Sequence, residues 1–302
     1  MSLRSLRQLF HDARNPPADP THLSFKGKVV LVTGANTGLG YQAALKYAAK
    51  GASLLILGVR TQEKGETAKA SIVRETGTSS EIIVETVDLS IFASVRQFCD
   101  RVCRRVPELH VALLCAGLAK PNFVRGPEGF EMALQVNVLS TALMALLLLP
   151  KLRETAAAAA DDEAFLPHVT FLNSHASHIV SEDAVPPGGR GLIEISNDAD
   201  IFHPETHYYV EKLAGFFAVR AIAEHNRKLG GDGSKVVVNA VCPGLCRTEL
   251  GRDFPFMQRV LMTPFQAIFS RSAEEGSRSL ISATGLGPES TGRLWFNDEY
   301  LE

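Results

Sequence analysis

The chain has 302 residues, with 31 Lys and Arg against 33 Asp and Glu, so its formal net charge is −2. Apolar residues make up 45% of the chain and charged residues 21%, which excludes intrinsic disorder and indicates a globular protein. The near-neutral charge excludes a nucleic-acid partner bound through bulk positive charge. Five cysteines are too few, and odd in number, for a disulfide scaffold, and no secretory signal is visible, so we expect a cytoplasmic protein.

Residues 1–24 are predicted to form an N-terminal extension of one short helix and a linker. Apolar residues recur near helical spacing before Pro16-Pro17, which would end the helix. We interpret this helix as packing on the main domain, with contact to a membrane surface as the alternative. The apolar run at 138–149 is shorter than the ~20 residues that a bilayer requires, and predicts a buried core helix.

From residue 25 onward, short apolar segments typical of buried strands alternate with helical segments. Strands are expected at 28–32, 54–57, 82–87, 111–115, 168–172, 236–241 and 294–297, and helices at 37–50, 64–76, 94–106, 128–152 and 208–228. This alternation predicts a parallel sheet with helices on both faces. We therefore expect a single α/β domain over residues 25–302, with a Rossmann-like doubly wound fold.

Two segments depart from this alternation. Residues 181–206 contain a Pro-Pro-Gly-Gly sequence and are interpreted as an inserted loop. Residues 249–272 are rich in large apolar side chains, which predicts a lid over a lipophilic site, with a packed edge as the alternative. These apolar residues are Phe254, Phe256, Met257, Leu261, Met262, Phe265 and Phe269.

A glycine-rich turn, TGANTGLG at residues 33–40, follows the first strand and opens the first helix of the domain. Glycines allow a tight turn and let the backbone approach a pyrophosphate, whose charge meets the N–H groups at the start of the helix. The pattern predicts a dinucleotide site. The expected cofactor contacts in this turn are Gly34, Thr37, Gly38, Leu39 and Gly40.

Arg60 determines which nicotinamide cofactor the sequence predicts. Enzymes that prefer NAD place a carboxylate about 20 residues after the glycines, at the end of the second strand. This chain has Arg60 there, and the next acidic residue is Glu63. A guanidinium can pair with a 2′-phosphate, so we predict NADP(H). The alternative is a solvated Arg60 on an enzyme that accepts both cofactors.

Tyr208 and Lys212 are four residues apart in a predicted helix, so they share one face. A free tyrosine ionises near pH ~10, and a neighbouring ammonium favours the phenolate. We therefore expect Lys212 to lower the pKa of Tyr208 and to make it a general acid or base. Tyr209 has no lysine four residues later.

With these residues the chain resembles the short-chain dehydrogenase/reductase family. The motifs follow in the family's order: Thr33–Gly40, Asp88-Leu89, Cys115-Ala116-Gly117, Asn137, Ser174, Tyr208-x-x-x-Lys212 and Pro243-Gly244-x-x-x-Thr248. The segments GANTGLG, RTQEKGE and LQVNVLSTALMALLLLPKL look most like the retinol-dehydrogenase-like branch, and the chain resembles fungal members that act in specialised metabolism.

The resemblance implies an NADPH-dependent reductase of a ketone or aldehyde, or an NADP-dependent alcohol dehydrogenase, and the apolar segment 249–272 favours a bulky lipophilic carbonyl or alcohol as its small-molecule substrate. Tyr208 would be the general acid, Lys212 would hold the nicotinamide ribose, Ser174 would bind the substrate oxygen, and Asn137 would hold a relay water. In this family the helices expected at 128–152 and 208–228 pair across a dimer axis, so the resemblance implies a homodimer, with internal packing of these faces or their cover by the N-terminal segment as the alternatives. The further cofactor contacts that it implies are Asp88, Ala116, Gly117, Pro243, Gly244 and Thr248.

Two departures from the family pattern leave questions open. Cys115 stands where the family usually has Asn, and a thiol cannot replace the paired donor and acceptor of an amide. One hydrogen-bonded link between the fourth strand and its surroundings is therefore in doubt. Ser174 and Tyr208 are also separated by a longer insertion than usual. An epimerase or cyclase on the same fold, and a non-catalytic NADPH-binding regulator, remain alternative functions. No metal is expected, because His175, His178, His203 and His207 lack the pattern of a zinc site.

Overall fold

The computed structural model describes residues 3–159, 165–180, 184–185, 189–230 and 235–301. Within them the strands form one sheet in the order β3-β2-β1-β4-β5-β6-β7-β8, in which every neighbouring pair is parallel except β7 and β8. The strands are β1 (Val29–Thr33), β2 (Leu54–Val59), β3 (Glu81–Thr86), β4 (Val111–Leu114), β5 (His168–Leu172), β6 (Val237–Val241), β7 (Leu294–Phe296) and β8 (Glu299–Leu301).

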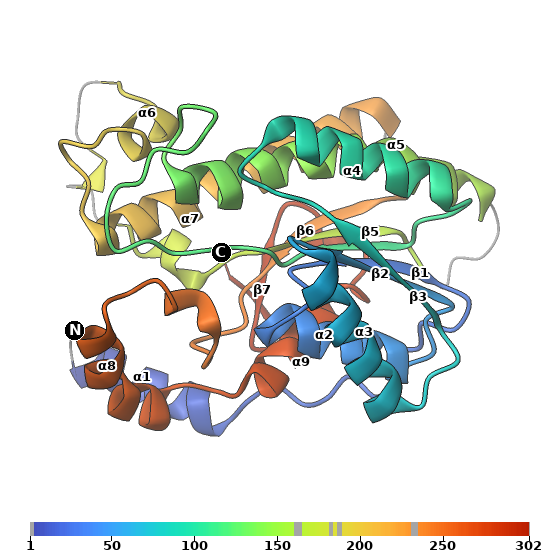
Figure 1. Ribbon diagram of the computed structural model, residues 1–302, viewed down its shortest axis with the longest axis horizontal. Coiled ribbons are helices and arrows are strands. Elements are labelled where there is room, and N and C mark those ends of the chain that lie inside the picture. Colours follow the sequence, from blue (N-terminus) through green and yellow to red (C-terminus); the bar gives the residue numbers. More distant parts are fainter. Residues whose placement is uncertain (1–2, 160–164, 181–183, 186–188, 231–234, 302) are drawn as a thin grey trace.

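Helices cover both faces of this sheet (Figure 1). The helices are α1 (Leu3–Arg14), α2 (Gly38–Ala49), α3 (Gln62–Thr76), α4 (Phe92–Arg105), α5 (Thr141–Ala158), α6 (Leu192–Ser196), α7 (Pro204–Gly230), α8 (Phe256–Phe269) and α9 (Ala273–Ala283). Helices α2, α3 and α9 pack on one face, and α4, α5 and α7 on the other. The predicted doubly wound α/β fold is confirmed.

Side-chain alternation along the central strand β1 supplies both layers of the core. Val29 and Leu31 point into the cluster that contains α4 and α5, whereas Val30 and Val32 point into the cluster that contains α2. All four side chains are buried, as expected for a parallel strand with a helical layer on each face. The strand order changes direction between β1 and β4, so a crevice for ligands is expected at their carboxyl ends.

The helix predicted at 128–152 begins and ends later than expected, at residues 134 and 158. It opens with a π-helical stretch, η1 (Leu134–Ser140), which continues directly into α5. Residues 134–158 together are long and apolar enough to cross a membrane by length and composition, but 56% of that window is buried inside the fold. Leu148, Leu149 and Leu152 belong to the core between α4 and α7, so this segment packs as a core helix.

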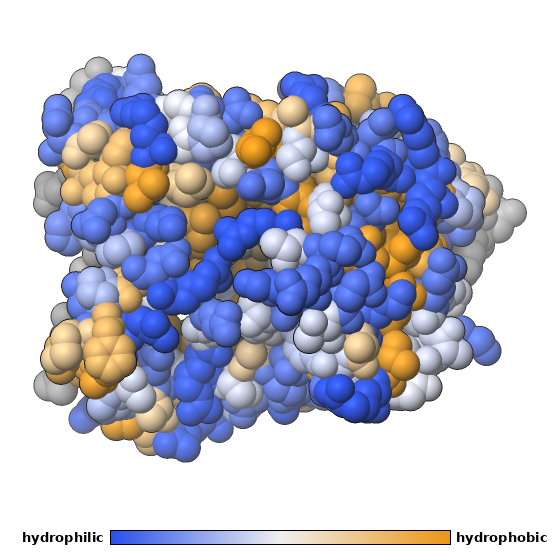
Figure 2. All heavy atoms as spheres, in the orientation of Figure 1, coloured by the Kyte–Doolittle hydropathy of each residue, from blue (hydrophilic) through white to orange (hydrophobic). Residues whose placement is uncertain are grey.

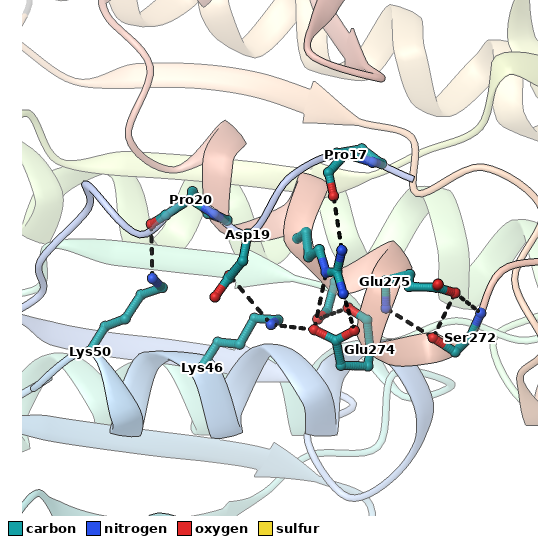
Figure 3. A network of polar contacts seen from close by, with 10 residues as sticks. Pro17, Asp19, Pro20, Lys46, Lys50, Ser272, Glu274 and Glu275 are labelled. Carbon is teal, nitrogen blue, oxygen red and sulfur yellow. Dashed lines mark hydrogen bonds and ion pairs between the residues drawn. The ribbon is translucent and has the colours of Figure 1, made fainter. Parts of the chain in front are cut away.

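The N-terminal segment is joined to the domain by a polar network (Figure 3). Lys46 of α2 lies between Asp19 and Glu274, with N–O distances of 3.4 and 2.6 Å. Arg278 of α9 pairs with Glu274 and donates to the carbonyl oxygen of Pro17. The stretch after α1 therefore lies across α2 and α9, and is held there by charges from both helices.

Several elements were not predicted from the sequence. The described part of the expected 181–206 loop contains the short helix α6 and the first residues of α7, while residues 181–183 and 186–188 lie outside the described part. The strand β8 pairs with β7 through a two-residue turn, in which Asn297 and Asp298 adopt positive φ angles of 50° and 62°. Such a turn allows a tight hairpin without glycine.

Asn239 provides a test of how β6 is fixed in the core. Its buried amide accepts a hydrogen bond from Thr170 on β5 and donates to Ala283 and Ser290, at 2.8, 2.9 and 3.1 Å. Asn239→Leu would remove these hydrogen bonds from Thr170, Ala283 and Ser290, so we expect the free energy of unfolding to fall by about 3 kcal/mol. Urea denaturation measures this change. The exposed Asn122→Leu serves as the control, and equal stability of the two variants would contradict the assignment.

Candidate active site

The glycine-rich turn brings backbone against backbone at the carboxyl end of β1. Gly34 has a left-handed φ of +68°, and a Cβ there would lie 2.9 Å from the Cα of Ala116. A Cβ on Gly40 would overlap the carbonyl oxygen of Gly34. Thr37 caps α2 without a side-chain hydrogen bond, so its side chain does not occupy the N–H groups of the first helical turn. This arrangement fits the phosphates of a dinucleotide, which bind N–H groups at a helix start.

Cys115 replaces the usual asparagine at the end of β4, which left open what joins β4 to its neighbours. Thr33 provides this link. Its Oγ1 accepts hydrogen bonds from the backbone N–H groups of Cys115 and Ala116, at 3.0 and 3.1 Å. Cys115 is a buried core residue, and burial raises the pKa of its thiol to about 12. The thiol is therefore protonated at neutral pH, and β4 is joined to β1 through Thr33.

The loop after β6 faces the glycine turn. The Thr248 side chain lies 3.6 Å from the position that a Cβ on Gly38 would take. Gly244 has a φ of +75°, and a Cβ there would approach the Nη1 of Arg271 to 3.0 Å. The structure thus places Thr248 beside the turn that is expected to hold the cofactor phosphates.

Arg271 is a structural residue of this loop that the sequence did not reveal. Its side chain is 1% exposed, and its Nη1 donates to the carbonyl oxygen of Pro243. Its Nε donates to the carbonyl oxygen of Asp12 in α1, at 2.8 Å. The rings of Phe10 and Phe269 meet edge to face nearby, at 6.3 Å between centroids. The N-terminal helix is therefore joined both to α8 and to the loop after β6.

Ser174, Tyr208 and Lys212 come together at the carboxyl end of β5. Ser174 lies close enough to the Tyr208 hydroxyl to lower its pKa, and the Nζ of Lys212 lies 5.6 Å from the centre of the Tyr208 ring. Asn173 links the two segments, because its side chain accepts from the N–H of Ser174 and donates to the carbonyl oxygen of Lys212. The insertion between Ser174 and Tyr208 thus leaves the three residues beside one another.

The prediction that the pKa of Tyr208 is lowered is wrong for the protein without a bound ligand. Burial raises this pKa above its usual value of 10.0, and it outweighs the lowering by the Lys212 ammonium and by the Ser174 hydrogen bond. Glu211 and Cys242 raise it further. Tyr208 therefore carries its proton at neutral pH, which is the state that a general acid requires.

Asn137 lies in the π-helical stretch and bridges to the loop after β4. Its Oδ1 accepts from the N–H of Leu118 at 2.9 Å, and its Nδ2 donates to the carbonyl oxygen of Leu118 at 2.7 Å. The Nδ2 also donates to Oε1 of Glu211 at 2.6 Å. Irregular helical turns of this kind are frequent at functional sites.

Two buried acidic residues near Asn137 were missed in the sequence. Glu211 is 1% exposed, and Glu131 is fully buried with its Oε2 at 2.9 Å from Nε2 of His207. Only the position of Glu211, directly before Lys212 and three residues after Tyr208, could have drawn attention to it. Glu131 is distant in the sequence, and no local pattern predicts its contact with His207.

Arg60 and Asp88 follow neighbouring strands, β2 and β3, at the same edge of the sheet. Arg60 is exposed, and its charge helps to lower the pKa of Asp253, whose main partner is Lys120 at 2.7 Å. The Oδ1 of Asp88 accepts hydrogen bonds from the backbone and hydroxyl of Ser90. Both residues therefore lie where the adenosine half of a dinucleotide is expected.

Comparison with known proteins agrees with this geometry. A family model described as short chain dehydrogenase matches residues 28–159. The short-chain dehydrogenase/reductase ffsI of Aspergillus flavipes is 42% identical over 295 residues, which cover 97% of this chain and 84% of that protein. The chain belongs to the short-chain dehydrogenase/reductase family. Within this family, the protein phmF of Phaeosphaeria nodorum is 40% identical over 285 residues, which cover 94% of this chain and 81% of that protein.

Solved short-chain dehydrogenase structures share the fold at low sequence identity. One from Mycobacterium marinum superposes with a TM-score of 0.67 at 20% identity, over 96% of each chain. Another, from Shigella flexneri and described as complexed with NADP, gives a TM-score of 0.61 at 21% identity, over 91% of this chain and 99% of that one.

Other features of this family member lie apart from the predicted catalytic residues. A polar surface hollow of about 420 Å³ is lined by Arg125, Arg190, Glu194 and residues 197–200, none of which is a predicted site residue. His175 stacks on Phe296, and the described residues contain no group of three or more His, Cys, Asp or Glu placed to hold a metal.

Two glycines with left-handed backbone provide a test of the cofactor turn. Gly34→Ala and Gly77→Ala introduce comparable backbone strain, at φ of +68° and +60°, but only the Cβ at Gly34 would meet another backbone segment. We expect Gly34→Ala to weaken binding of the nicotinamide cofactor at least about tenfold, or ~1.4 kcal/mol, and Gly77→Ala to leave it unchanged. Fluorescence titration measures both. Equal affinities in the two variants would remove Gly34 from the site.

Proposed function

We propose that this short-chain dehydrogenase/reductase uses NADPH to reduce a ketone or aldehyde group on a bulky lipophilic substrate. The observation that carries the proposal is the contact among Ser174, Tyr208 and Lys212 at the carboxyl ends of the strands. The protonated state of Tyr208 supports reduction as the direction, because a general acid must hold its proton before the reaction.

The chain's own residues provide a site for NADPH. The N–H groups at the start of α2 would hold the phosphates, Lys212 would bind the nicotinamide ribose, and Thr248 would close the site from the loop after β6. When bound, NADPH supplies the hydride that reduces the carbonyl carbon. Arg60 would pair with the 2′-phosphate, and this supports NADP(H) over NAD(H) because a guanidinium matches a phosphate with two parallel hydrogen bonds.

Proton transfer and charge stabilisation fall to three side chains. Ser174 would donate a hydrogen bond to the substrate oxygen, and Tyr208 would transfer its hydroxyl proton to that oxygen as the carbonyl carbon gains the hydride. The ammonium of Lys212 would stabilise the phenolate that remains. A proton from solvent then restores Tyr208, and the product is an alcohol.

Helix α8 supports a lipophilic substrate. Phe256 and Leu261 are 73% and 72% exposed, and Figure 2 shows apolar side chains gathered over α1 and α8 at its lower left. Lys120 and Asp253 connect the loop after β4 to the segment that precedes α8. We propose that α8 is the lid of the substrate site, because an exposed apolar surface beside a cofactor site is suited to an apolar ligand.

Replacement of Arg60 tests the cofactor preference. Arg60→Ala removes the proposed partner of the 2′-phosphate, so we expect NADPH to bind at least about tenfold more weakly while the affinity for NADH stays the same. Titration of the nicotinamide fluorescence of each cofactor gives both constants. Arg74→Ala, which removes an exposed arginine of α3, is the control, and an unchanged NADPH affinity in Arg60→Ala would refute the role of Arg60.

Replacement of Tyr208 tests the chemistry. We expect Tyr208→Phe to bind NADPH but to lose at least about 100-fold in carbonyl-dependent NADPH oxidation, whereas the neighbouring Tyr209→Phe keeps its activity. Because the pKa of Tyr208 is raised, wild-type reduction should stay constant across neutral pH and fall only in the alkaline range. Loss of NADPH absorbance with a series of lipophilic aldehydes and ketones measures the rates. Full activity of Tyr208→Phe would exclude this mechanism.

A further inference from the structure

Glu211 is a buried carboxylate that the proposed reaction does not use. It precedes Lys212 on α7, and its side chain is 1% exposed. A carboxylate in such a position is costly unless nearby groups compensate its charge. The groups around Glu211 therefore indicate which residues its charge and its hydrogen bond affect.

The orientation of the Asn137 amide defines the contact with Glu211. The Oδ1 of Asn137 must accept from the N–H of Leu118, and its Nδ2 must donate to the carbonyl oxygen of the same residue. The second hydrogen of Nδ2 then points to Oε1 of Glu211, at 2.6 Å. Glu211 is thus an acceptor from Asn137 and joins the π-helical stretch to α7.

The charged and titratable groups that face Glu211 come from two elements. Lys212 and His207 lie on α7 with it, and Glu131 approaches from the segment before η1. Burial raises the pKa of Glu211, while Lys212, the Asn137 hydrogen bond and His207 lower it, and Glu131 raises it. Glu131 is itself paired with His207.

A small cavity borders the same groups. It has a volume of about 10 Å³, and Asn137, Glu211 and Lys212 line it together with residues 171–173 and 215. A space of this size with several polar neighbours holds about one water molecule. The cavity therefore places Glu211 within one water molecule of Asn137 and Lys212.

We propose that Glu211 is a positioning residue of the reductase, which orients Asn137 and places a buried negative charge beside Lys212 and Tyr208. This inference rests on the proposed function for its consequence in catalysis. The charge opposes formation of the Tyr208 phenolate, so it keeps the general acid protonated. For this effect Glu211 must be ionised where Tyr208 titrates; burial raises the pKa of its carboxyl group, whereas Lys212, the Asn137 hydrogen bond and His207 favour the ionised form.

Glu211→Gln separates the charge from the hydrogen bond, since the Gln amide oxygen can still accept from Asn137. We expect the alkaline fall of the reduction rate to move to lower pH by about one unit, because Glu211 raises the Tyr208 pKa through its charge and the Gln side chain carries none. Glu224→Gln removes an exposed carboxylate from the same helix and should leave the profile unchanged. A profile of Glu211→Gln that superimposes on that of the wild type would overturn the proposal.

A second measurement does not depend on activity. The phenolate absorbance of Tyr208, obtained by subtracting the pH titration of Tyr208→Phe, should appear at lower pH in Glu211→Gln than in the wild type and in Glu211→Asp, which keeps the charge. Circular dichroism restricts the comparison to pH values at which each variant is folded. A shifted titration in a protein without reductase activity would support the role of Glu211 and refute the proposed function, whereas an unshifted titration would overturn the role itself.

Discussion

The hydroxyl group of Thr33 makes the contact on which the arrangement of the site depends. It joins β1 to β4 where the strand order changes direction, by accepting hydrogen bonds from two consecutive N–H groups at the end of β4. These two hydrogen bonds hold the glycine turn against the backbone of Ala116. Only a residue without a side chain fits at Gly34. The crevice for the dinucleotide is therefore set by backbone contacts and one side-chain oxygen.

Helix α7 contains Tyr208 and Lys212, the residues proposed to react. It also contains charged and titratable groups that are buried near them. Tyr208 and Lys212 lie on one face of it, while His207 and Glu211 connect it to Glu131 and to the π-helical stretch. Each buried carboxylate has a partner that donates to it, as the cost of burying charge requires. In the proposed mechanism, the contacts that join α7 to its neighbours therefore also influence the protonation of Tyr208.

Local patterns predicted most of the fold and the central part of the site. Alternating strands and helices, the glycine turn and the Tyr-x-x-x-Lys pair each depend on residues close in the sequence, so spacing alone indicates them. The missed residues act over long distances along the chain. Arg271 bonds to Asp12 of α1, and Glu131 bonds to His207 of α7, and neither pairing leaves a periodic signal.

By itself, the sequence determined the doubly wound fold, the position of the cofactor turn and the identity of the Tyr–Lys pair, because these follow from hydrophobic periodicity and from the backbone freedom of glycine. Only the tertiary structure decided the protonation state of Tyr208 and the place of Glu211. The spacing of Tyr208 and Lys212 predicted a lowered pKa, but burial outweighs the ammonium. Desolvation depends on every element packed around a group, and that environment exists only in the folded chain.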